Sequence, residues 1–378
     1  MKKLQQGDCS WGTIKLVLGW VIDTVAMTIQ LPQWSVERLA EILASIPRTQ
    51  KRTSAKKWHK VLGELRSMAL ALPGSRNIFS QLQNALSTKK GARVTLRKGV
   101  HDALDDFRWM HENIASRPTR IAELVPLAPS AEGHHDASGM GAGGVWFPGT
   151  HLAQRQGTKN REPVVWRHEW PECVRLRLQT EDNPTGTITN SDLELAGGLL
   201  HLESIVQTFD CRERTLLSKG DNLATTFWER KGSTSSDKPA SYLLRLFGMH
   251  QRFHHYVSRF DYISGPSNHI ADSLSHHFHL TWPALMRSLS PFFPKNAGYQ
   301  VWTPSPAIVS AVTSALLRKQ SPRESLLVKP PTPTPLGTSG LASQLDWAST
   351  PLSKPSKTKY QSYKSLPTEF VPENLQPT

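Results

Sequence analysis

Apolar positions follow two different spacings along the first third of the chain. Residues 14–30 are rich in β-branched and aromatic side chains, which predicts two strands joined by a turn near Asp23–Thr24. Residues 33–125 instead carry apolar residues three and four positions apart, the spacing of amphipathic helices. Ser35 is the expected N-cap of the first of these helices, and a second helix is expected after Ser54. These apolar stripes are expected to form the core of a mainly helical region.

After Pro126 the pattern alternates between strands and helices. Two adjacent glycines, Gly197 and Gly198, lie inside a predicted helix at 191–208, where each costs about 1 kcal/mol relative to alanine. We therefore expect this helix to pack closely against a sheet. The alternation predicts an α/β fold that begins with antiparallel strands and adds parallel ones. Further strands are predicted at 215–221 and 259–264, and helices at 223–230, at 242–257 and through Asp272.

The last part of the chain has a different composition. Fifteen of the twenty-seven prolines lie between Pro283 and the end, including the run PPTPTP at 330–335. Such a composition is typical of a linker. Residues 291–378 are therefore expected to be a Pro/Ser/Thr-rich linker or tail that is largely disordered, with helical periodicity only at 308–317.

Length, cysteine content and hydropathy limit the class of protein. A chain of 378 residues predicts two or three domains. The three cysteines, Cys9, Cys173 and Cys211, match neither a disulfide framework nor a zinc knuckle. The apolar run at 14–22 is too short to span a bilayer. We expect an intracellular protein of the cytoplasm or nucleus that is neither secreted nor bound to a membrane.

Positive charge is concentrated in one segment. The formal net charge is +14, and residues 48–98 contain thirteen Lys and Arg against a single acid, Glu64. Such a block predicts contacts with nucleic-acid phosphates; the alternatives are a solvated basic surface and a nuclear-targeting cluster. The candidate nucleic-acid-binding residues are Arg48, Lys51, Arg52, Lys56, Lys57, Lys60, Lys89, Lys90 and Arg93.

Four acidic residues lie among small residues at the ends of predicted elements. Asp136 lies in HHDASGMGAGG and Glu194 in NSDLELAGG. Asp221 lies in LSKGDNLATTFW and Asp272 in GPSNHIADSLSHH. Each also has a structural alternative: Glu194 would complete a capping box with Ser191, and the aspartates would cap helices or turns. The glycines after Asp136 lead into a strand, which excludes a dinucleotide-binding loop.

These motifs, D-A-S-x-x-G-x-G, E-L-A, D-N-x-A and N-x-I-A-D-x-L-S in this order, resemble the ribonuclease H domain of retroelement reverse transcriptases of the DIRS-like or gypsy-like groups. The resemblance covers residues 14–290. It implies that Asp136, Glu194, Asp221 and Asp272 are catalytic and bind two Mg²⁺ or Mn²⁺ ions, which hydrolyse the RNA strand of RNA–DNA hybrids.

The resemblance also implies a domain order. Residues 1–32 would be the end of a reverse-transcriptase palm, 33–125 a basic helical thumb and connection, and 126–290 a ribonuclease H-like domain with a mixed five-stranded sheet flanked by helices. The paired aspartates of a polymerase site are absent, because Asp105–Asp106 lie within a predicted amphipathic helix. We therefore expect no polymerase activity, with the missing polymerase portion as a further partner besides nucleic acid.

Other interpretations stay open. The strand before Asp136 is polar for a central strand, and a polar insertion at roughly 149–189 separates Asp136 from Glu194. Both features would also suit a catalytically inactive, nucleic-acid-binding remnant of a retroelement. The tail SKTKYQSYKSLPTEF alone suggests a recombinase or integrase arm. The adjacent histidine pairs, such as His254–His255, point apart and predict no zinc site.

Overall fold

The structure is a computed structural model that describes residues 12–87, 91–150, 152–154, 162–234, 239–293 and 298–320. The chain divides into two compact units, residues 1–334 and 335–378, and all described residues belong to the first. Expectations for Lys89, Lys90 and the tail beyond 320 lie outside the described residues. Within the described part of the chain, no helix has both the length and the apolar character to cross a bilayer.

The first sheet is antiparallel, with the order β1-β2-β3-β6. The expected strand pair with a turn near Asp23–Thr24 is confirmed by β2 and β3, which pair antiparallel with Asp23 opposite Thr28. The Asp23 Oδ1 accepts hydrogen bonds from the Val25 and Ala26 N–H groups in this turn. A further strand, β1, precedes this pair and is joined to β2 at Leu18–Gly19. Both linking residues have positive φ angles, 51° and 86°, as a two-residue hairpin turn requires. The strands are β1 (Ile14–Val17), β2 (Trp20–Asp23), β3 (Thr28–Gln30) and β6 (Thr119–Arg120).

The expected helical region follows, with its apolar stripes buried. The second helix, α3, follows Ser54 as predicted, and the Ser54 side chain caps it by accepting a hydrogen bond from the Lys57 backbone N–H at 3.1 Å. The first helix begins after Pro32 instead of Ser35, which is buried inside the first turn. The elements are α2 (Gln33–Ala44), β4 (Arg52–Ser54), α3 (Ala55–Met68), α4 (Phe79–Ser87), β5 (Arg93–Thr95) and α5 (Lys98–Glu112).

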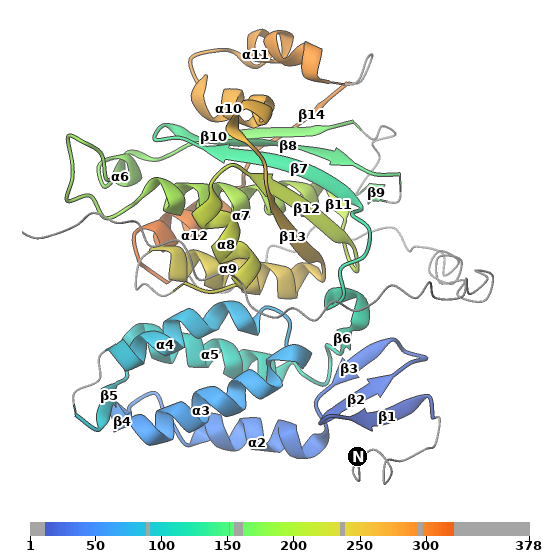
Figure 1. Ribbon diagram of the computed structural model, residues 1–378, viewed down its shortest axis with the longest axis vertical. Coiled ribbons are helices and arrows are strands. Elements are labelled where there is room, and N and C mark those ends of the chain that lie inside the picture. Colours follow the sequence, from blue (N-terminus) through green and yellow to red (C-terminus); the bar gives the residue numbers. More distant parts are fainter. Residues whose placement is uncertain are drawn as a thin grey trace, which may run out of the picture. The chain divides into compact units, whose positions relative to one another are not determined.

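A six-stranded mixed sheet forms the second half, with the order β13-β12-β7-β8-β10-β14 (Figure 1). Strands β7, β8 and β10 are antiparallel neighbours, whereas β12 and β13 run parallel to β7. This arrangement confirms the expected mixed α/β class. The strands are β7 (Ala131–Ala137), β8 (Gly141–Pro148), β10 (Val164–Glu169), β12 (Thr215–Gly220), β13 (Val257–Tyr262) and β14 (Gln300–Trp302).

Helices cover both faces of this sheet (Figure 1). A Cβ at Gly197 would lie 3.2 Å from the Ala142 Cβ, so the predicted close packing of the glycine-containing helix α7 on the sheet is confirmed. A smaller apolar cluster on the opposite face joins α10 and α11 to β8 and β10. The helices are α7 (Asn190–Thr208), α8 (Leu223–Lys231), α9 (Pro239–His254), α10 (His269–His276), α11 (Trp282–Leu289) and α12 (Pro306–Leu316).

The sheet has six strands rather than five because β14 pairs in parallel with β10. This strand and α12 lie in the segment expected to be a disordered tail, and that expectation does not hold for residues 298–320. Pro306 stands in the first turn of α12, where a proline is tolerated, and Ser305 caps that helix. The expected insertion at roughly 149–189 supplies β10 as well as α6 (Glu172–Arg175).

Buried contacts join the helical region to α9. The Arg245 guanidinium donates two hydrogen bonds to Asp106, at 2.5 and 2.8 Å, and both side chains are buried. Asp105 accepts a hydrogen bond from the Arg48 Nε at 2.9 Å. The two adjacent aspartates therefore both have ion-pair partners within the fold.

Candidate functional site

Two of the candidate carboxylates lie at the same edge of the six-stranded sheet. Asp136 is near the carboxyl end of β7, and Asp221 directly follows β12, which runs parallel to β7. Carboxyl ends of parallel strands meet at one edge. Asp221 is not a helix cap, because Asn222 is the N-cap of α8 and accepts a hydrogen bond from the Thr225 N–H at 3.0 Å.

Glu194 comes from the beginning of α7, and it is not a capping residue. The capping box of α7 is made by Thr189 and Asp192, whose carboxylate accepts a hydrogen bond from the Thr189 N–H at 2.9 Å. The alternative interpretation of Glu194 as part of a capping box with Ser191 is therefore wrong. Glu194 is 3% exposed, and its Oε2 has no hydrogen-bond partner among the described residues.

Asp136, Glu194 and Asp221 converge, each with one carboxylate oxygen within 4.8 Å of the others. Burial, with the added repulsion of the two aspartates, raises the pKa of Glu194 well above its ordinary value. Burial also raises the pKa of Asp136 and of Asp221. The trio thus holds unfavourable negative charge, which a bound cation would relieve.

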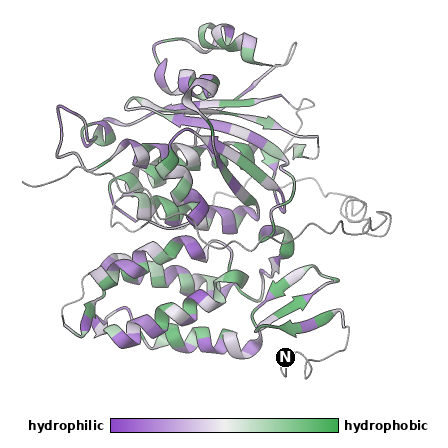
Figure 2. Cartoon of the chain, viewed as in Figure 1, coloured by the Kyte–Doolittle hydropathy of each residue, from purple (hydrophilic) through white to green (hydrophobic). Residues whose placement is uncertain are grey.

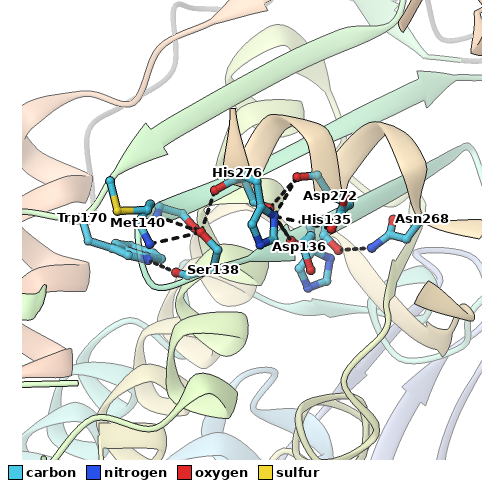
Figure 3. Close-up of polar contacts among 10 residues, drawn as sticks. His135, Asp136, Ser138, Met140, Trp170, Asn268, Asp272 and His276 are labelled. Atoms are coloured by element: carbon cyan, nitrogen blue, oxygen red, sulfur yellow. Dashed lines mark hydrogen bonds and ion pairs between the residues drawn. The ribbon is translucent and has the colours of Figure 1, made fainter. Parts of the chain in front are cut away.

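Asp272 lies next to Asp136 and comes from α10, which covers the face of the sheet opposite α7 (Figure 1). It forms a second group with Asp136 and His276, again with ligand atoms within 4.8 Å. The His276 Nδ1 is 3.4 Å from Asp272 Oδ1 and 3.8 Å from Asp136 Oδ2 (Figure 3). Asp272 lies inside α10, whose N-cap is Asn268, so the alternative interpretation of Asp272 as a helix cap is also wrong.

Two buried neutral residues hold the aspartates, and neither was predicted. Ser275 donates a hydrogen bond to Asp136, which opposes the effect of burial on the pKa of that carboxyl. The Asn268 Nδ2 donates to the His135 carbonyl oxygen at 3.0 Å, and its side chain also lowers the pKa of Asp221. Ser275 and His276 follow Asp272 by one turn of α10, and this spacing is the sequence feature that could have placed them beside the carboxylates.

The polarity of β7 is explained by pairing within the sheet. Figure 2 shows hydrophilic residues along this central strand. Glu132 pairs with Lys219 on β12, and the His135 Nδ1 lies 3.2 Å from the Ser218 hydroxyl. Burial lowers the pKa of His135 to about 4, so its imidazole is neutral at pH 7. The polar strand is therefore compatible with a well-formed site at Asp136.

Those candidate nucleic-acid-binding residues that the structure describes lie on and beside the antiparallel β4–β5 ribbon. Arg48 is paired with Asp105, and the Lys60 Nζ lies 3.7 Å from the Glu64 carboxylate. The remaining described members of the set are exposed, although the Lys57 ammonium also donates to a backbone carbonyl. These members are Lys51, Arg52, Lys56, Lys57 and Arg93.

Sequence comparisons find no matching protein-family model and no matching curated protein. Among solved structures, the chain is similar to the foamy viral protease-reverse transcriptase in complex with an RNA/DNA hybrid, with 10% identity and a TM-score of 0.26 over 67% of this chain and 29% of that one. Two complexes with double-stranded DNA match at 11% identity, with TM-scores of 0.26 and 0.27 over 66% and 67% of this chain. The chain spans 38% and 45% of those two proteins. With TM-scores this low, the structural similarity to a reverse transcriptase is weak.

Proposed function

We propose that the chain is a ribonuclease H-type endonuclease that hydrolyses the RNA strand of RNA–DNA hybrids as part of a retroelement reverse transcriptase. The observation that carries this proposal is the convergence of Asp136, Glu194 and Asp221 from two strands and a helix. The three antiparallel strands followed by two parallel ones also suit a ribonuclease H-like domain.

The donor set fits hard divalent cations such as Mg²⁺ or Mn²⁺. These ions prefer oxygen ligands, and the buried Glu194 Oε2 lacks a partner among the described residues. Asp136, Glu194 and Asp221 would hold one ion, and Asp136 with Asp272 a second. When bound, two such ions supply an activated water and stabilise the leaving oxygen.

The surrounding residues orient these ligands. Ser275 fixes the Asp136 carboxylate through its hydrogen bond, and Asn268 ties α10 to the β7 backbone. At the exposed side of the site, the half-exposed His276 imidazole lies beside Asp272 and Asp136. The chain thus supplies buried ligands on the inner side of the site and a histidine at its exposed side.

A hybrid-cleavage assay tests the proposal. With Mg²⁺ or Mn²⁺, Asp221→Asn should lower the cleavage rate at least about a hundredfold, the scale of losing one charge-stabilising group. Asp182→Asn, at an exposed loop position, is the matched control and should cleave as the wild type does. Equal rates for wild type and Asp221→Asn would refute the assignment.

A non-catalytic nucleic-acid-binding role is the second candidate, favoured by the exposed basic residues around β4–β5. Replacing Lys51, Arg52 and Arg93 with alanine should flatten the dependence of hybrid affinity on salt by about 0.9 in log–log slope for each phosphate that is no longer neutralised. Arg175→Ala, exposed on α6, is the control. Salt-dependent binding without cleavage by the wild type would select this role over the nuclease.

A further inference from the structure

A second cluster of metal-ligating side chains lies between α7 and α9, separate from the carboxylate site. Glu203 of α7 faces His250 and His254 of α9, and all three residues are buried. The two histidines are four residues apart, so they lie on the same helical face. None of the three belongs to the proposed nuclease site.

The three donor atoms lie close to one another. The Glu203 Oε2 is 2.7 Å from the His250 Nε2 and 3.7 Å from the His254 Nε2. The two imidazole rings lie side by side, with centroids 4.4 Å apart. One oxygen and two nitrogen atoms therefore lie within 4.8 Å of one another.

Outer hydrogen bonds orient these donors. The His250 Nδ1 lies 2.7 Å from the Tyr256 hydroxyl, which leaves the Nε2 facing Glu203. The other Glu203 oxygen accepts a hydrogen bond from the Gln207 Nε2 at 2.9 Å. Metal-binding histidines and carboxylates are commonly held in this way by their non-ligating atoms. A buried Glu–His ion pair alone would not require a second imidazole at the same oxygen.

We propose that Glu203, His250 and His254 bind one zinc-class divalent ion. Two imidazole nitrogens and one carboxylate suit Zn²⁺ better than Mg²⁺, which prefers oxygen ligands, and a solvent molecule would complete the four ligands. The ion would link α7, which carries Glu194, to α9. The adjacent pair His254–His255 is not the relevant one, because His255 has a φ of 58° and lies near Glu123.

Metal retention by the full-length chain tests this site independently of nuclease activity. The Asp136→Asn/Asp221→Asn variant, which weakens the carboxylate site, is loaded with Zn²⁺ and dialysed, and its zinc content is measured by mass spectrometry. We expect one ion per chain in this variant. Adding His254→Asn should remove that ion, whereas His255→Asn should keep it, since asparagine tolerates the left-handed backbone of residue 255.

Cobalt substitution provides a second measurement that needs no change in the cluster. Co²⁺ bound by the folded Asp136→Asn/Asp221→Asn variant should show the intense visible absorption of a four-coordinate, histidine-containing site. Displacement of Co²⁺ by Zn²⁺ should remove it, and Mg²⁺ should not. Absence of this absorption, no retained zinc, or equal zinc in the His254→Asn variant would overturn the proposal. The cluster would then be a hydrogen-bonded ion pair.

Discussion

Replacing Glu194 with glutamine is expected to stabilise the metal-free protein while abolishing hybrid cleavage. The carboxylate is buried, faces Asp136 and Asp221, and has one oxygen without a hydrogen-bond partner among the described residues. Glutamine has nearly the same shape but no charge, and its amide can donate to the neighbouring aspartates. The variant removes the repulsion and loses one proposed metal ligand.

The expected stabilisation follows from the cost of an unsatisfied buried polar group, about 1–3 kcal/mol. For a domain of this size that corresponds to a rise of about 2–10 °C in melting temperature. Because the pKa of Glu194 is raised well above its ordinary 4.5, its contribution to stability is full below pH 4.5 and is lost as pH rises through the folded-state pKa. The increase in melting temperature caused by Glu194→Gln should therefore become larger as the pH rises above 4.5.

The assay is thermal unfolding of wild type and Glu194→Gln in EDTA and in Mg²⁺, over a pH series. Mg²⁺ should stabilise the wild type more than the variant, so the difference in melting temperature should shrink or reverse with the ion. Glu181→Gln, at an exposed loop position, is the control and should leave the melting temperature unchanged. A metal-free Glu194→Gln protein that is no more stable than the wild type would refute the reasoning.

Three further predictions concern the support of the site. Ser275→Ala should cost about 1 kcal/mol in urea unfolding and raise the pKa of Asp136, which moves the acidic limb of the cleavage rate to higher pH. Gly143→Ala should cost about 1–3 kcal/mol and reduce cleavage, because the new Cβ would lie 2.5 Å from the Leu274 Cβ and displace α10. Asp272→Asn, whose side chain is 58% exposed, should change the free energy of unfolding by less than about 0.5 kcal/mol yet reduce cleavage more than tenfold.

Gly139→Ala is the control for the change at Gly143, because its Cβ would meet an ordinary contact at 3.5 Å. Equal stability of the two glycine variants would contradict the packing argument for α10. An unchanged pH profile in Ser275→Ala would show that this serine does not set the charge of Asp136. Wild-type cleavage by Asp272→Asn would confine the metal ligands to the other three carboxylates.

Local patterns were sufficient to predict most of the elements. The apolar spacing in 33–125 predicted the helices there, and the Gly197–Gly198 pair predicted a helix pressed against a sheet. These features depend on residues within a few positions of one another. The same is true of the capping of α3 by Ser54, which needs only a backbone N–H three residues away.

Tertiary structure decided which local alternatives were used. A capping box at Ser191 and Glu194 was locally acceptable, but the helix begins at Thr189–Asp192 instead, and Glu194 is buried beside two aspartates. Likewise, the proline-rich composition predicted a largely disordered tail with helical periodicity at 308–317. The helix is confirmed as α12, but it is not part of a disordered tail, because its buried apolar stripe packs on α7 and α9.

By itself, the sequence determined the helical and strand patterns, the basic block and the order of the four acidic residues. The support of Asp136 by Ser275, 139 residues away, and the grouping of Glu203 with His250 depended on how the chain returns to the sheet. Strand register and helix packing create such neighbours, and residue spacing along the chain does not encode them. Hydrogen bonds act over a few ångströms in space, so only the tertiary structure determined which polar side chains meet.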